Sequence, residues 1–266
     1  MGILNRLQSY YSWLMSDPVG FILYLFYFAV CILITLIFHE VAHGYVAWRC
    51  GDPTAKMLGR LSLDPRKHLD PIGTLCLVFL GFGWAKPVPV NPRNFKNYRR
   101  DDFLVSIAGI TVNFIMFLLA LSLAIGINSL LWRPEVINAN GGAKAFLSSR
   151  SWIVNVLLVG EGTQLSEFMR FPWLQHVQRF LLLLANMNLS IAIFNFLPIP
   201  PLDGFHIFND ILFKGRFQLT GNMFQIAQVV LMVLIFSGAL SGVLSSIIGG
   251  VENVVLNFLL LIAGKG

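Results

Sequence analysis

Two histidines and a glutamate stand at the end of a long apolar run near the start of the chain, in the segment His39-Glu40-Val41-Ala42-His43. Because His39 and His43 are four residues apart, a helix projects both imidazoles from one face, and Glu40 lies about 100° further round. Two histidines at this spacing can hold a zinc ion while a carboxylate acts on water bound to it. The segment therefore predicts one catalytic zinc, with His39 and His43 as ligands and Glu40 as general base.

A catalytic zinc needs a third protein ligand and keeps its fourth position open for water. The carboxylates within or beside the long apolar runs are Glu40, Asp203 and Glu252. Asp203 directly follows a stretch with three prolines at 198–201, which cannot continue a regular helix, and it precedes Gly204. Such a break lets the chain turn a side chain inward. Asp203 is therefore the expected third ligand, although it could instead cap the helix that follows.

These residues must be carried by helices that cross a membrane. Hydrophobic residues make up 56% of the 266-residue chain and charged residues only 12%, where soluble domains have about 25% charged residues. A spanning helix needs about 20 apolar residues. Three uncharged runs are longer than that, and 19–48 is too, with Glu40 as its one acidic residue, while 253–264 is too short. We expect an all-α polytopic membrane protein, a single domain over 1–266, with about four long transmembrane helices at 19–48, 103–132, 180–202 and 221–251.

The basic residues predict which side of the membrane holds the site. Most of the 19 Lys and Arg residues lie in 49–71, 86–102 and 214–216, and basic loops favour the cytoplasmic side. That orientation places the HExxH helix end and Asp203 toward the cytoplasm of a multi-pass cell-membrane protein. The same basic loops account for the net charge of +6 without any nucleic-acid partner.

The two connections between spans have distinct expected structures. Segment 72–85 is flanked by basic stretches and is too short for an ordinary span, so region 55–92 is expected to be re-entrant and partly β, with a strand edge for an unwound substrate. A short true span over 72–85 is the alternative. Segment 133–175 is then an outer loop, and its apolar run 152–159 predicts a short helix lying in the interface. The membrane-embedded core comprises 19–132 and 176–251.

The motifs together resemble the site-2 protease family of intramembrane metalloproteases, in its compact bacterial and archaeal form without a PDZ domain. The resemblance rests on HEVAH, on the stretch NFLPIPPLDG that ends in Asp203 and Gly204, and on GRLSLDPRKHLDPIGT followed by GWAKPVPVNPRNF. It covers about 39–115 and 180–215. One departure is Ala108-Gly109-Ile110, where the family usually has a proline in the third position.

The resemblance implies regulated intramembrane proteolysis, in which a zinc enzyme cuts transmembrane protein substrates within the lipid bilayer. It implies that His39, His43 and Asp203 bind zinc, that Glu40 is the catalytic base and that Asn195 helps to bind the substrate carbonyl. A hydrogen bond between helices would explain Asn195 equally well. A membrane zinc transporter with the same ligands, or a catalytically inactive membrane-binding relative, remains the alternative.

Overall fold

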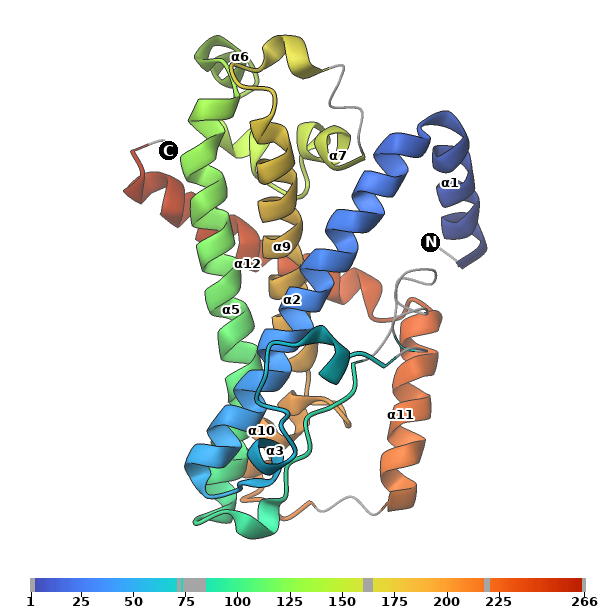
Figure 1. Ribbon diagram of the computed structural model, residues 1–266, viewed down its shortest axis with the longest axis vertical. Coiled ribbons are helices and arrows are strands. Elements are labelled where there is room, and N and C mark those ends of the chain that lie inside the picture. The colour runs from blue at the N-terminus through green and yellow to red at the C-terminus, as the bar shows by residue number, and fades with distance from the viewer. Residues whose placement is uncertain (1–2, 71–72, 74–84, 160–164, 218–220, 265–266) are drawn as a thin grey trace. The chain divides into compact units, whose positions relative to one another are not determined.

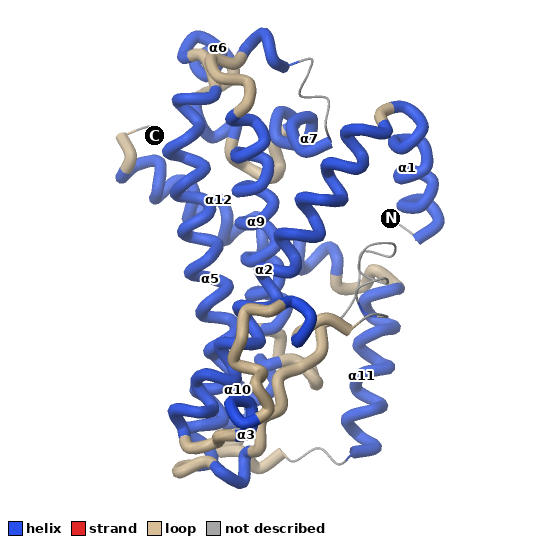
Figure 2. The backbone as a smooth tube through the Cα atoms, viewed as in Figure 1, coloured by secondary structure: helices blue, strands red, loops and turns tan. Residues whose placement is uncertain are grey.

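The computed structural model describes residues 3–70, 73, 85–159, 165–217 and 221–264. The chain is 76% helical, and no strand occurs among these residues (Figure 2). The long helices are followed along the chain in Figure 1. In order the elements are α1 (Ile3–Ser16), α2 (Pro18–Cys50), α3 (Thr54–Met57), η1 (Pro65–Lys67), η2 (Pro92–Asn94), α5 (Tyr98–Leu131), α6 (Pro134–Ala139), η3 (Ala143–Phe146), α7 (Trp152–Val159), η4 (Ser166–Phe168), α9 (Leu174–Asn195), α10 (Asp203–Leu212), α11 (Gly221–Phe236) and α12 (Ser241–Ile262).

Four of these helices are long and apolar enough to cross a membrane: α2 with 33 residues, α5 with 34, and α9 and α12 with 22 each. The prediction of an all-α chain with four long apolar helices is confirmed. Three of the helices take in most of the runs expected at 19–48, 103–132 and 180–202. The third run ends as a helix at Asn195, just before the prolines of 198–201.

The prediction of one span over 221–251 is wrong. The chain forms α11 with 16 residues and then α12, and the turn between them contains Gly238 at φ 74°. A positive φ is open to glycine because it lacks a Cβ, so Ser237-Gly238 ends one helix where hydrophobicity alone predicts continuity. The fourth candidate span is α12, which takes in most of the tail at 253–264.

The partly β character expected for 55–92 is not found in its described residues. They contain α3, η1 and one isolated antiparallel bridge, between Leu69 and Ala85. Backbone groups that could pair in a strand are instead bonded to a side chain. Arg60 Nη2 donates to the carbonyl oxygens of Lys86 and Pro87 at 2.7 and 3.1 Å. The predicted turn at 72–85 lies outside the described residues, apart from residues 73 and 85.

The chain forms two compact units, and each of the helices α2, α5, α9 and α12 contributes to both. The first unit contains 33–114 and 190–244. Its small apolar cluster joins α5, α9 and α10 through Ile110, Ala192 and Ile207, with Phe103 and Ile107 packed against it. This unit holds all the residues that the sequence predicts for the site.

Asp52 ties the end of α2 to the segment that precedes α5. Its carboxylate is fully buried and accepts hydrogen bonds from the hydroxyl of Thr54, the backbone N–H of Thr54 at 3.1 Å, the backbone N–H of Asn91 at 2.7 Å and Asn94 Nδ2 at 2.8 Å. Burial raises the pKa of Asp52, but these hydrogen bonds outweigh it and hold the pKa below its ordinary value. Asp52 therefore fixes segment 91–94 beside the HExxH helix.

The second unit contains 4–32, 115–189 and 245–266. Gln178 of α9 is fully buried at its centre, accepting from Trp132 Nε1 at 2.9 Å and donating to Asn128 Oδ1 at 2.8 Å. Glu252 of α12 accepts hydrogen bonds from the backbone N–H of Ser149, at 2.7 Å, and from its hydroxyl. A charged group thus joins α12 to the connection between α5 and α9.

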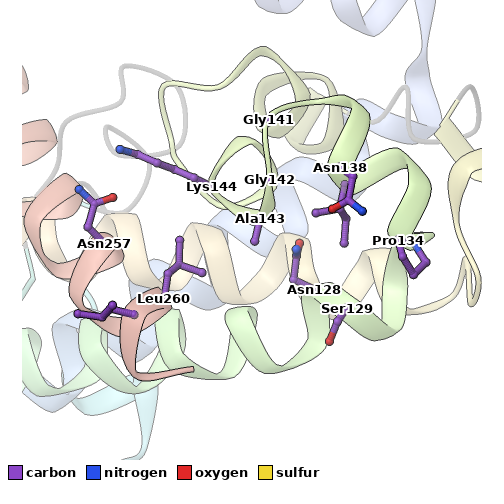
Figure 3. A pocket seen from close by; sticks show the side chains of 12 residues that line it. Asn128, Ser129, Pro134, Asn138, Gly141, Gly142, Ala143, Lys144, Asn257 and Leu260 are labelled. Atoms are coloured by element: carbon purple, nitrogen blue, oxygen red, sulfur yellow. The ribbon is translucent and has the colours of Figure 1, made fainter. Parts of the chain in front are cut away.

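A cavity of about 820 Å³ lies in this second unit between α5, α6, η3 and α12 (Figure 3). Amide side chains of Asn128, Asn138 and Asn257 line it together with Leu260. None of the residues predicted for the zinc site lines it. In the same unit, α7 begins and ends at the residues predicted for a short helix, 152–159, while its placement in the membrane interface stays a prediction.

Candidate zinc site

Helix α2 carries the two histidines into the interior of the first unit. His39 and His43 lie one turn apart on the same face, and both are buried, with 5% and 9% of their surfaces exposed. Their rings meet edge to face with centroids 4.6 Å apart. His43 Nδ1 lies 2.7 Å from the backbone carbonyl oxygen of Val105 on α5, which turns Nε2 toward His39.

Three potential ligand atoms converge at this point. His39 Nε2 and His43 Nε2 are 3.0 Å apart, and Asp203 Oδ2 lies 3.2 Å from the first and 3.3 Å from the second. Zinc bonds of about 2.0–2.1 Å at tetrahedral angles place neighbouring ligand atoms about 3.3 Å apart. The triangle therefore has the size of one face of a zinc tetrahedron. Asp203 Oδ2 is also buried without a hydrogen-bond donor of its own.

Asp203 reaches the histidines because the chain turns sharply between α9 and α10. It is the first residue of α10, whose N-cap is Leu202 and lacks a side-chain cap hydrogen bond. Gly204 packs so closely on this turn that an added Cβ would lie 2.3 Å from the carbonyl oxygen of Leu197 and 2.4 Å from that of Phe196. The glycine after Asp203 is thus required by backbone packing.

Gly109 of α5 makes room for both imidazoles. A Cβ at this position would lie 2.5 Å from His43 Nε2, 2.6 Å from His39 Cε1 and 2.7 Å from His39 Nδ1. Ordinary contact begins at about 3.4 Å, so any side chain here would collide with the candidate ligands. Ile110, which stands where the resembling family usually has proline, instead packs in the apolar cluster with Ala192 and Ile207.

Glu40 lies next to His39 in sequence and is half-buried. Its Oε2 accepts a hydrogen bond of 2.7 Å from the backbone N–H of Val88. Val88 stands between two prolines, which cannot donate, so its N–H is the donor that this stretch of backbone offers. The carboxylate is therefore oriented by backbone three residues before the segment 91–94 that Asp52 fixes.

Asn195 is the last residue of α9 and is half-buried. Its Nδ2 donates to the carbonyl oxygen of Ile191, one turn earlier in the same helix, at 3.1 Å. It is not part of the group formed by His39, His43 and Asp203. The structure thus brings three of the five predicted site residues together, with Glu40 adjacent in sequence to one of them.

Acidic and basic groups lie along α10 from His206 to Asp210. His206 Nδ1 pairs with Asp102 Oδ2 of α5 at 3.1 Å, and Arg99 Nε donates to the backbone carbonyl oxygen of Asp210 at 2.6 Å. The hydrogen bond to Asp102 raises the pKa of His206. Burial, followed by the charge of Asp102, raises the pKa of Asp210 to about 6. These groups hold α10, and hence Asp203, against the first turns of α5.

Sequence reasoning missed three contributors to the site: Val88, Gly109 as the residue that makes room for the rings, and Asn113. Asn113 Nδ2 lies 3.2 Å from His39 Nδ1, and the residue is fully buried. A signal for it was present, because an amide stood inside an apolar span four residues after a glycine. Val88 gave no comparable signal, because its contact with Glu40 joins segments that lie far apart in the sequence.

Comparison with known proteins agrees with this site. The family model described as peptidase family M50 matches residues 27–238. A protein of Bacillus subtilis, provisionally named zinc metalloprotease YwhC, is 37% identical over 194 residues, which cover 71% of this chain and 70% of that protein. A Mycobacterium tuberculosis protein, provisionally named zinc metalloprotease Rip2, is 32% identical over 157 residues, which cover 55% of this chain and 58% of that protein.

Solved structures give no significant match. The matching family and the two relatives are named for zinc proteolysis, so they do not favour a transporter or an inactive relative. The four apolar helices fit a protein embedded in the lipid bilayer. The chain therefore belongs to peptidase family M50, the site-2 protease family, and is a multi-pass, intramembrane zinc metalloprotease.

Proposed function

We propose that this protease cuts transmembrane protein substrates within or beside their membrane-spanning segments, using zinc held by His39, His43 and Asp203. The observation that carries the ligand assignment is the triangle of 3.0, 3.2 and 3.3 Å formed by His39 Nε2, His43 Nε2 and Asp203 Oδ2. Two neutral imidazoles and one carboxylate are a donor set that suits a catalytic zinc and leaves a fourth position free.

Glu40 is the proposed general base. When bound, zinc supplies Lewis-acid chemistry, polarising the scissile carbonyl and making water a better acid. Glu40 takes the proton from the attacking water and later gives it to the leaving amide nitrogen. The Val88 N–H holds Glu40 Oε2 at 2.7 Å, which fixes the direction of the carboxylate and leaves its other oxygen to move the proton.

Asn195 is proposed to bind the substrate carbonyl, as the family resemblance implies. Its amide now donates within its own helix, to Ile191 at 3.1 Å, so binding requires that the Nδ2 group exchange this acceptor for the substrate. A substrate helix must also unwind, because its carbonyl groups are bonded and hidden until then. Its cleavage site is proposed to lie toward the cytoplasm. The basic segments 49–71 and 86–102 adjoin the end of α2 and the start of α5, and basic segments favour the cytoplasmic side of a membrane.

The experiment combines metal analysis with substrate discovery. Fragments of membrane proteins are compared between cells with the wild-type protein and with Glu40→Gln, and the zinc content of each purified protein is measured. We expect Glu40→Gln to keep zinc and lose cleavage, and Asp203→Ala to lose zinc as well. Glu135→Gln is the matched control, since Glu135 is exposed on α6. Continued cleavage by Glu40→Gln would refute the mechanism, and full zinc in Asp203→Ala would refute the ligand assignment.

A further inference from the structure

One face of α5 serves both candidate histidine ligands. Val105, Gly109 and Asn113 are spaced four residues apart, so they lie along one face of the helix. The Val105 carbonyl oxygen lies 2.7 Å from His43 Nδ1, Gly109 leaves space for both rings, and Asn113 Nδ2 lies 3.2 Å from His39 Nδ1. Asn113 is fully buried, within a helix that could cross a membrane.

Zinc binding dictates which nitrogen of each ring carries a proton. A neutral imidazole gives the lone pair of one nitrogen to the metal, and its other nitrogen is then an N–H donor. Nε2 is the atom of both His39 and His43 that faces Asp203. Both Nδ1 atoms must therefore donate. His43 has a suitable acceptor in the Val105 carbonyl oxygen.

Among the described residues, the group recorded beside His39 Nδ1 is the amide of Asn113. An amide nitrogen cannot accept, whereas the Oδ1 atom of Asn113 can, and this oxygen is buried with no hydrogen-bond partner among the described residues. A half-turn about the Cβ–Cγ bond exchanges the two amide atoms and brings Oδ1 to the place beside His39 Nδ1. The site with zinc thus has one hydrogen bond from each ligand imidazole to α5.

We propose that Asn113 is a positioning residue that fixes the ring orientation and tautomer of His39 by accepting a hydrogen bond from its Nδ1–H. The inference rests on the proposed assignment of His39, His43 and Asp203 as zinc ligands. Groups that accept from a ligand histidine contribute about 10–100-fold to metal affinity. Asn113 contacts neither water nor substrate in this scheme and acts only through His39.

The test measures zinc affinity of the full chain by competition with a chelator, without any substrate. Asn113→Leu keeps the approximate size and removes the acceptor, so we expect about 10–100-fold weaker zinc binding. Asn113→Asp keeps both size and acceptor and should restore the affinity of the wild-type protein. Asn128→Leu is the matched control, because Asn128 is an equally buried asparagine of α5 that accepts from Gln178. It should bind zinc as the wild type does.

Wild-type affinity in Asn113→Leu would overturn the proposal. So would a loss in Asn113→Asp as large as that in Asn113→Leu, because Asp keeps the acceptor that the proposal requires. If Asn113→Leu does not fold, Asn113→Asp decides alone: retained affinity supports the proposal and a loss overturns it. The ligand assignment is tested separately by Asp203→Ala, and proteolysis by Glu40→Gln, so failure of the proposed function is told apart from failure of this inference.

Discussion

Substitution of Gly109 by alanine should disable the zinc site without weakening the helix that carries the residue. The new Cβ would lie 2.5 Å from His43 Nε2, where ordinary contact begins at 3.4 Å, so ring and helix must separate by the 0.9 Å difference. Zinc sites tolerate ligand displacements of only about 0.2 Å. We therefore expect zinc affinity to fall by at least about 100-fold, equivalent to about 2.8 kcal/mol.

The assay is chelator competition on the full chain in detergent, together with thermal unfolding of the zinc-free protein. Alanine has the higher helix propensity, by about 1 kcal/mol, so the helix itself should not lose stability. Gly126→Ala is the matched control, because Gly126 lies in the same helix and an added Cβ would meet nothing within 4 Å. Wild-type zinc affinity in Gly109→Ala would show that the rings do not occupy the place assigned to the ligands.

Three further outcomes follow from polar groups of the first unit. Val88→Pro removes the donor to Glu40 and, at about 1.5–3 kcal/mol for a hydrogen bond to a charged group, should slow cleavage by about 10–100-fold while zinc content stays unchanged. Asp52→Ala leaves four donors without their acceptor and should cost about 3 kcal/mol in unfolding free energy, measured by denaturant titration. The pKa of Asp210 is raised from 3.8 to about 6, so folding favours its protonated form and stability falls as pH rises from 4 through 6. Asp210→Asn should therefore raise the melting temperature at pH 8 and leave it nearly unchanged at pH 4, and equal shifts at both pH values would contradict this explanation.

Three of the long helices could be predicted from the sequence, because the thickness of a bilayer sets the length of apolar run that a spanning helix needs. It also predicted that His39, His43 and Asp203 meet, since intramembrane charges are costly unless they serve a site. It failed at 221–251, where one glycine with positive φ ends a helix that hydrophobicity would continue. It failed at 55–92, because backbone groups there bond to side chains.

Other features of the site depend on three-dimensional packing and could not be predicted from the sequence. The need for Gly109 arises from the separation of α5 and α2, and that separation depends on packing along both helices. The contact of Val88 with Glu40 joins residues 48 positions apart and leaves no periodic signal. Asn113 was detectable as a polar residue inside an apolar span, but its partner was not.

The carboxylate of Glu252 imposes an order on biogenesis. An acidic side chain in the middle of a lone membrane helix is costly, by about 2.5–3.5 kcal/mol or more when it is charged, and α12 carries Glu252. Its compensation comes from Ser149, while Arg150 Nη2 donates to the carbonyl oxygen of Ser245 in α12 at 2.9 Å. Residues 149–150 leave the ribosome about a hundred residues before Glu252. The loop is thus synthesised before the helix whose carboxylate it stabilises, and α12 meets its partner only after that loop has been made.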